Sequence, residues 1–154
     1  MAATGLEQFD KSLQTANIWL RELMKRLGSD RHTAWSVLGA VLHTLRDRLT
    51  NEQVAHLGNQ LPLLVRGLFY DQWHPVAVSK KLRKGEEFLA RISERLQTKR
   101  LVNTEQAARS VFSVLVAHPK GEIQKILKTL PPEIRALAST EPTELSKESP
   151  FAWE

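Results

Sequence analysis

The chain of 154 residues contains no cysteine, which excludes disulfide scaffolds, zinc ribbons, iron–sulfur centres and thiol nucleophiles. Aromatic residues make up only 6% of the chain, and its seven glycines are scattered singly. No glycine-rich loop is therefore present to cradle a nucleotide phosphate. No apolar run approaches the roughly 18 residues that a membrane-spanning helix needs, and the amino end lacks a secretory signal pattern. We expect a cytoplasmic protein without membrane attachment.

Histidine is the residue type that most invites a metal or acid–base site. The five histidines stand at positions 32, 43, 56, 74 and 118, and none belongs to a His-x-x-x-His or Glu-x-x-His pair. Such pairs let two ligands on one helix converge on one ion, so we expect no metal site. His43 and Asp47 are spaced to hydrogen-bond on a helix face, but no nucleophile elbow accompanies them. We therefore predict neither a cofactor nor an enzyme.

Apolar residues recur with helical spacing through most of the chain. The clearest series alternates steps of three and four residues and forms one apolar seam along a helix: Leu6, Phe9, Leu13, Ala16, Leu20, Leu23 and Leu27. Thr4 and Glu7 predict a capping box at the start of this helix, and Gly28 predicts a left-handed end. No sustained alternation of β-branched and polar residues indicates a strand. The predicted fold class is all-α.

The second half of the chain repeats the apolar pattern of the first. A shift of 69 residues aligns Val65 and Arg66 with Ile134 and Arg135, and it aligns further apolar positions of both halves. We predict about eight helices in two four-helix units, each long, then medium, then two short, packed as a pseudo-twofold bundle. The predicted domain covers residues 1–138, with repeats at about 6–69 and 76–138.

Charge divides the chain into a basic body and an acidic tail. The net charge is +5, but residues 139–154 contain four Glu and one Lys. This tail has too few apolar residues to fold alone, so we predict a flexible segment. Phe151 and Trp153 lie at its end, where large aromatic side chains are suited either to anchor a partner or to fold back onto the domain.

A second candidate surface is a cluster of cations in the middle of the chain. Its members are Lys80, Lys81, Arg83 and Lys84. A basic face of this kind attracts anionic partners, nucleic acid included. The glutamates that follow on the same predicted helix interrupt the positive charge, however, and favour a face that is merely solvated.

Several stretches of the sequence resemble one known family, the bacterial proteins classified as domain of unknown function 2267. The resemblance covers roughly residues 15 to 138 and rests on HTLRDRLT at 43–50, LPLLVRGL at 61–68, Tyr70, Trp73, Pro75, EEFL at 86–89 and LPPEIRAL at 130–137. It implies an all-helical protein and brings no established activity. Gln72 departs from the family pattern, because a small residue, often Gly, is expected before the Trp. The turn at this point is therefore expected to differ.

The turn from Tyr70 to Pro75 is the most unusual chemistry in the sequence, since a phenol, a carboxylate, an indole and an imidazole lie close together. Tyr70 and Trp73 are suited to an aromatic platform between the two repeats, with Asp71 or His74 as a polar contact. Alternatively, Trp73 plugs the seam between the repeats and serves packing alone. Both interpretations place this turn at the junction of the two halves.

Arg66 recurs in the second repeat as Arg135, so the two side chains occupy equivalent positions. A functional arginine would grip a carboxylate or phosphate with its planar fork. A structural arginine would instead satisfy carbonyls at the end of a neighbouring helix, or pair with an acid such as Asp47. The repetition favours the structural role.

The sequence as a whole predicts a non-enzymatic binding protein. We expect its partner to be another protein, bound at the inter-repeat seam around Tyr70, Trp73 and His74, with the aromatic tail as a further anchor. The alternative is an anionic partner bound by the basic face. The process in which the protein acts is not indicated by any of these features.

Overall fold

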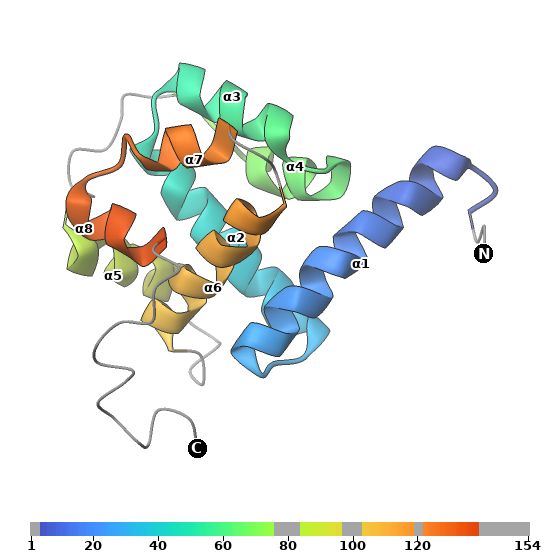
Figure 1. Ribbon diagram of the computed structural model, residues 1–154, viewed down its shortest axis with the longest axis horizontal. Coiled ribbons are helices and arrows are strands. Elements are labelled where there is room, and N and C mark those ends of the chain that lie inside the picture. Colours follow the sequence, from blue (N-terminus) through green and yellow to red (C-terminus); the bar gives the residue numbers. More distant parts are fainter. Residues whose placement is uncertain (1–3, 76–83, 97–102, 119–121, 139–154) are drawn as a thin grey trace.

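The computed structural model describes residues 4–75, 84–96, 103–118 and 122–138, and helices make up the regular structure of these residues. The prediction of an all-α fold is thus confirmed for the part of the chain that is described (Figure 1). The elements in chain order are α1 (Glu7–Leu27), α2 (Arg31–Arg48), α3 (Asn51–Gln60), α4 (Leu63–Tyr70), α5 (Gly85–Arg95), α6 (Thr104–Ala117), α7 (Glu122–Leu127), α8 (Pro132–Arg135) and the 3₁₀ helix η2 (Ala136–Ala138).

Local signals set several helix ends. Thr50 and Gln53 form a capping box at the start of α3, where each side chain bonds the backbone of the other. Gly28 ends α1 in the left-handed conformation that its sequence position predicts. The capping box predicted at Thr4 and Glu7 is wrong, because α1 begins after Leu6 and the Thr4 hydroxyl donates to Asp10 Oδ1 instead.

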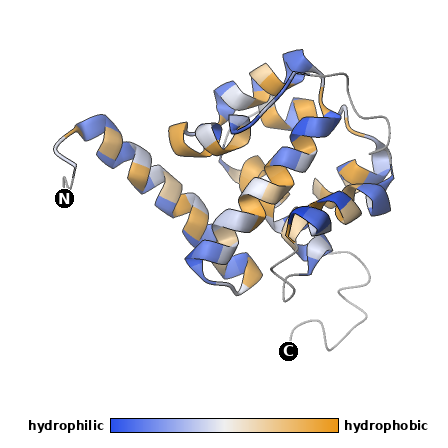
Figure 2. Cartoon of the chain, turned by 180° about the vertical axis from the view of Figure 1, so that it is seen from behind, coloured by the Kyte–Doolittle hydropathy of each residue, from blue (hydrophilic) through white to orange (hydrophobic). Residues whose placement is uncertain are grey.

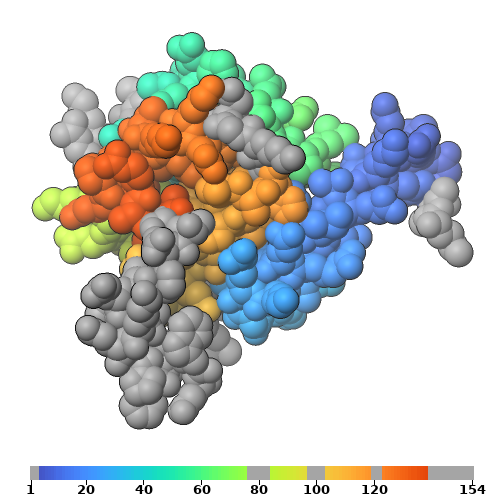
Figure 3. All heavy atoms as spheres, viewed as in Figure 1, coloured from blue at the N-terminus to red at the C-terminus, as the bar shows by residue number. Residues whose placement is uncertain are grey.

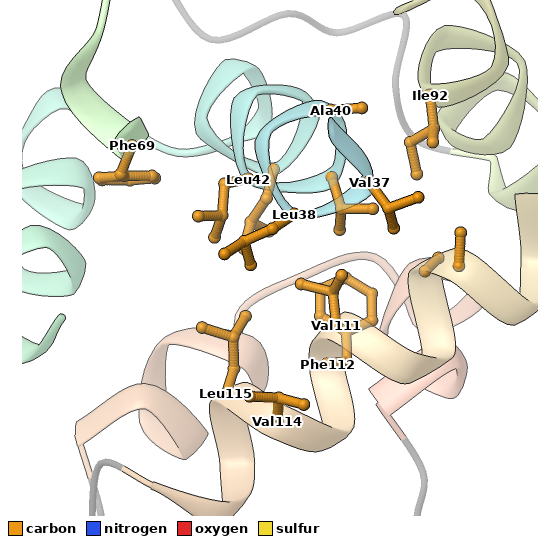
Figure 4. Packing of buried hydrophobic residues seen from close by; sticks show 14 of the residues in the cluster. Val37, Leu38, Ala40, Leu42, Phe69, Ile92, Val111, Phe112, Val114 and Leu115 are labelled. Carbon is orange, nitrogen blue, oxygen red and sulfur yellow. The ribbon is translucent and has the colours of Figure 1, made fainter. Parts of the chain in front are cut away.

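The centre of the molecule is the contact between α2 and α6. Figure 4 shows Leu38 and Leu42 of α2 facing Val111 and Leu115 of α6, and all four side chains are buried. Phe69 from α4 and further residues from both halves of the chain complete one continuous apolar core. Burial of this core stabilises the fold, because each large apolar side chain contributes about 1.5–3 kcal/mol when it leaves water.

Several helix contacts are arranged alike in the two halves. The contacts of α2 with α6 and α3 with α7 join equivalent helices, α1 packs on α6 as α5 packs on α2, and α1 packs on α4 as α5 packs on α8. The contacts of α2 and α3 with α4 have no comparable counterpart at α8 among the described residues, so the pseudo-twofold arrangement of two repeats stays a prediction. Helix lengths differ from the expected order, because the described α5 has 11 residues and α6 has 14.

The inner half of α1 is fastened to α6 by polar and aromatic contacts as well as by the core. His118 at the end of α6 stacks on Trp19 with 5.2 Å between ring centroids, and its Nε2 lies 2.7 Å from Glu22 Oε2. Gln106 Nε2 donates to the carbonyl of Arg26 further along α1. These contacts hold the C-terminal half of α1 against α6 and so set the direction of its N-terminal half.

No described helix combines the length and the apolar character that crossing a bilayer requires. The acidic tail at 139–154 lies outside the described residues, as does most of the segment between α4 and α5. The predicted boundary between domain and tail therefore stays a prediction.

Candidate functional site

The turn after α4 is held in place by two side chains of α2. His43 Nε2 lies 2.7 Å from the carbonyl oxygen of Leu68. Arg46 Nη1 donates to the carbonyls of Phe69, at 2.6 Å, and of Asp71, at 2.9 Å. The last carbonyls of a helix have no partner within the helix, and Arg46 supplies one for the carbonyl of Phe69, while the carbonyl of Leu68 also accepts from the N–H of Asp71. The turn that follows is thereby attached to the centre of the fold.

Burial sets the charge state of His43. It lowers the pKa of the His43 imidazole, and the positive charges of Arg46 and Arg95 act in the same direction, against the hydrogen bond to Leu68. The ring is therefore neutral at pH 7. Because a carbonyl oxygen only accepts, Nε2 carries the proton and donates it to Leu68. Burial likewise lowers the pKa of Arg46 from the ordinary value for arginine.

The pairing of His43 with Asp47 that the spacing allowed is not formed. The Asp47 carboxylate accepts instead from Arg95 of α5, with 2.7 Å between Oδ2 and Nη2. A second Arg95 nitrogen donates to the hydroxyl of Thr44, which is buried in α2. The polar residues of the 43–50 stretch thus join α2 to α4 and α5, and His43 and Asp47 do not form an acid–base pair.

Tyr70 and Trp73 pack together at the end of α4, with 5.7 Å between ring centroids. Both rings are half-buried and rest against the apolar core, while Asp71 and His74 are exposed. The Tyr70 hydroxyl lies over α3 and donates to the carbonyl of Val54 at 3.3 Å. Trp73 therefore packs against the apolar core, and its predicted position as a plug between the two repeats stays a prediction. Partner contacts by the exposed Asp71 and His74 stay a prediction.

Gln72 adopts a backbone conformation that suits glycine, with φ at 58°. This left-handed region costs a residue with a Cβ atom about 1–2 kcal/mol, whereas added flexibility in the unfolded chain costs glycine about 0.5–1 kcal/mol. We expect Gln72→Gly to raise the free energy of unfolding by about 0.5 kcal/mol. Urea denaturation followed by circular dichroism measures this change. Gln72→Ala keeps the Cβ atom and is the control, and an equal gain from both variants would contradict the argument.

Arg66 and Arg135 both contact carbonyls of the short helix before them. Arg66 donates from Nε to Gly58 and from Nη2 to Leu61, each at 2.9 Å, and so completes the end of α3. Arg135 reaches the carbonyl of Lys128 at 3.4 Å, a longer contact of the same kind. The helix-end role is therefore the one observed, while the pairing of Arg66 with Asp47 is not formed.

Large apolar side chains are exposed on α1 and on α4. Phe9 is 56% exposed and Leu63 is 55% exposed, and the smallest exposure in the set is 39%. We call this set the α1–α4 surface: Leu6, Phe9, Leu13, Leu63 and Leu64. The two helices pack against each other, and Figure 3 shows the atoms of α1 running out past those of α4. The sequence predicted the seam on α1 but not that its first three members would lie in water.

Of the remaining predicted site residues, the structure describes Lys84 alone. Lys80, Lys81 and Arg83 lie outside the described residues, and so do Phe151 and Trp153 of the tail. Lys84 is exposed and precedes the first residue of α5. Within the part of the chain that is described, no three His, Asp or Glu side chains are grouped as metal ligands. The anionic-partner alternative therefore stays a prediction from sequence.

Comparison with protein families gives a match for most of the chain. The chain matches, over residues 16–137, the family described as "Uncharacterized conserved protein (DUF2267)". None of the curated proteins compared with the chain matches it. The match begins at Ala16, so Leu6, Phe9 and Leu13 precede the region that the family shares.

Proposed function

We propose a protein-binding, non-catalytic function for this chain, which belongs to the DUF2267 family of uncharacterised conserved proteins. The binding site is the α1–α4 surface, and its ligand is an amphipathic helix of another protein molecule. The absence of cysteine fits a reducing compartment, and we place this function in the cytoplasm.

One observation carries the proposal, which is the gathering of five large exposed apolar side chains on two helices that touch. Isolated apolar residues are common on protein surfaces, but a contiguous apolar patch typically marks an interaction site. The series Leu6, Phe9 and Leu13 has the spacing with which one helix packs on another. A partner helix would remove this surface from water and gain the free energy of its burial.

The polar chemistry of the described residues supports a non-catalytic role. His43 donates to a backbone carbonyl, Asp47 is paired with Arg95, and Arg66 completes the end of α3. Each of these side chains is hydrogen-bonded or paired with another residue of the same chain. A general base or an anion-binding arginine needs its polar atoms directed toward a substrate.

Site-specific photo-crosslinking in cells that produce the full chain tests this function. A benzophenone side chain at Phe9 or at Leu63 is expected to form adducts with a protein molecule. Lys25 is the matched control, because it is also exposed on α1 but lies off the apolar seam. Adducts at the two surface positions in clear excess over Lys25 support the proposal. Equal yields at all three positions would refute it.

A further inference from the structure

The first turns of α1 form an arm that the other described residues do not cover. Among residues 4–15 none is buried, and the first buried residue of the helix is Ala16. Figures 1 and 2 show that this arm extends beyond the other helices toward the N-terminus. The arm continues the packed part of α1, and burial of its apolar seam against another helix would remove that seam from water.

The charge of the arm fits a second copy of the same chain. Its charged residues are Glu7, Asp10 and Lys11, which leaves a net charge of −1, and Glu7 and Lys11 already pair with each other. Asp10 accepts two hydrogen bonds from Thr4. Two such arms therefore meet with little electrostatic repulsion. A strongly acidic or basic partner, in contrast, finds no matching charge here.

The seam is also self-complementary in shape. When two copies of the arm run antiparallel about a two-fold axis between Phe9 and Leu13, Phe9 of one chain lies opposite Leu13 of the other, and the reverse. Both contacts repeat because the interface is isologous. In the same arrangement Leu6 lies opposite Ala16, where the arm joins the body of the partner.

The size of the patch suits a dimer. Five side chains that each expose about half of their surface provide on the order of 400 Å² of apolar area, the size of patch that marks an interaction site. The polar residues beside the seam add to this area, and a stable dimer of standard size buries about 800 Å² per partner. The apolar area already includes Leu63 and Leu64 of α4, and without them the arm presents only a single row of side chains.

We infer that the α1–α4 surface joins two copies of this chain into an antiparallel, two-fold symmetric dimer. The inference rests on the proposed function and names its partner. The arm lies before the region that matches the family, whereas Leu63 and Leu64 of the same surface lie within that region.

Sedimentation equilibrium of the purified full chain tests the inference. We expect a mass of twice 17.5 kDa that falls to the single mass on dilution. Phe9→Glu is expected to weaken the dimer at least about tenfold, because it places a charge in the apolar contact. Phe9 is exposed in the monomer, so this variant leaves the fold intact. Ile18→Glu is the matched control, since Ile18 is 44% exposed on α1 but off the seam.

The absence of native cysteine allows a direct test of orientation. A mixture of Phe9→Cys chains and Leu13→Cys chains is expected to form mixed disulfides faster than either chain alone. Faster pairing within one variant would overturn the antiparallel arrangement.

The two proposals fail in different ways. A chain that stays monomeric, or a dimer that Phe9→Glu and Ile18→Glu affect equally, overturns the second-copy inference. If photo-adducts at Phe9 then contain a different protein, the proposed function still stands. If no adducts form at Phe9 or Leu63, both proposals fall.

Discussion

Arg46→Gln is expected to lower the free energy of unfolding by about 3 kcal/mol, because it removes a buried donor from two backbone carbonyls. Arg46 is only 8% exposed, and its Nη1 supplies a hydrogen bond to Phe69 and another to Asp71. Glutamine is too short to span the same distance. The carbonyl of the buried Phe69 would then be left without its partner in a region that little water reaches.

Urea denaturation monitored by circular dichroism measures this effect. Arg21→Gln is the matched control, because Arg21 is exposed on α1 and the same change there is expected to cost less than about 0.5 kcal/mol. The attachment of the turn gives a second readout. The amide of Trp73, which donates to Tyr70, should exchange faster in Arg46→Gln. Equal stability of the two arginine variants would contradict the role assigned to Arg46.

Gly58→Ala is expected to destabilise the protein by about 2 kcal/mol, against the usual preference of helices for alanine. A Cβ atom at Gly58 would overlap the hydroxyl and ring of Tyr70, which lies across α3. The ring cannot withdraw freely, since Tyr70 also packs on Phe69 and Trp73. Steric overlap therefore outweighs the gain of about 1 kcal/mol that alanine brings inside a helix.

Gly67→Ala provides the matched control for this substitution. Gly67 also lies within a helix, but a Cβ atom there would have no neighbour within 4 Å. We expect Gly67→Ala to stabilise the protein by about 1 kcal/mol. In a Tyr70→Leu background the cost of Gly58→Ala should largely disappear. A persistent cost in that background would show that the clash with Tyr70 is not its cause.

Most of the helical framework could be predicted from local pattern. The capping residues Asp30, Thr50 and Asn103 each accept a hydrogen bond from the backbone three residues later, as their positions indicate. These signals are strong because a cap involves only neighbours in the chain. Thr4 carries the same kind of signal and fails, because α1 begins at Glu7 with Leu6 at the cap position, and the Thr4 oxygen accepts from the N–H of Leu6 instead.

The candidate site was only partly predictable. The helical spacing of Leu6, Phe9 and Leu13 placed them on one face, but the same spacing continues into the buried Leu20 and Leu23. Nothing in the sequence marks the residue at which the body stops covering the helix. For Arg66, the sequence allowed two roles, which were to bind an anionic ligand or to satisfy carbonyls at a helix end. The structure shows the second role, because Arg66 donates to carbonyls at the end of α3.

The sequence by itself determined the all-α class, the position of most helix ends and the membership of the family, because these depend on local periodicity and on neighbouring residues. Only the tertiary structure decided that Asp47 pairs with Arg95, that Arg46 holds the end of α4, and that the first turns of α1 are left exposed by the other residues that the structure describes. The reason is physical. A polar group bonds whichever partner the fold brings within reach, and an apolar face stays exposed wherever no other helix arrives to cover it.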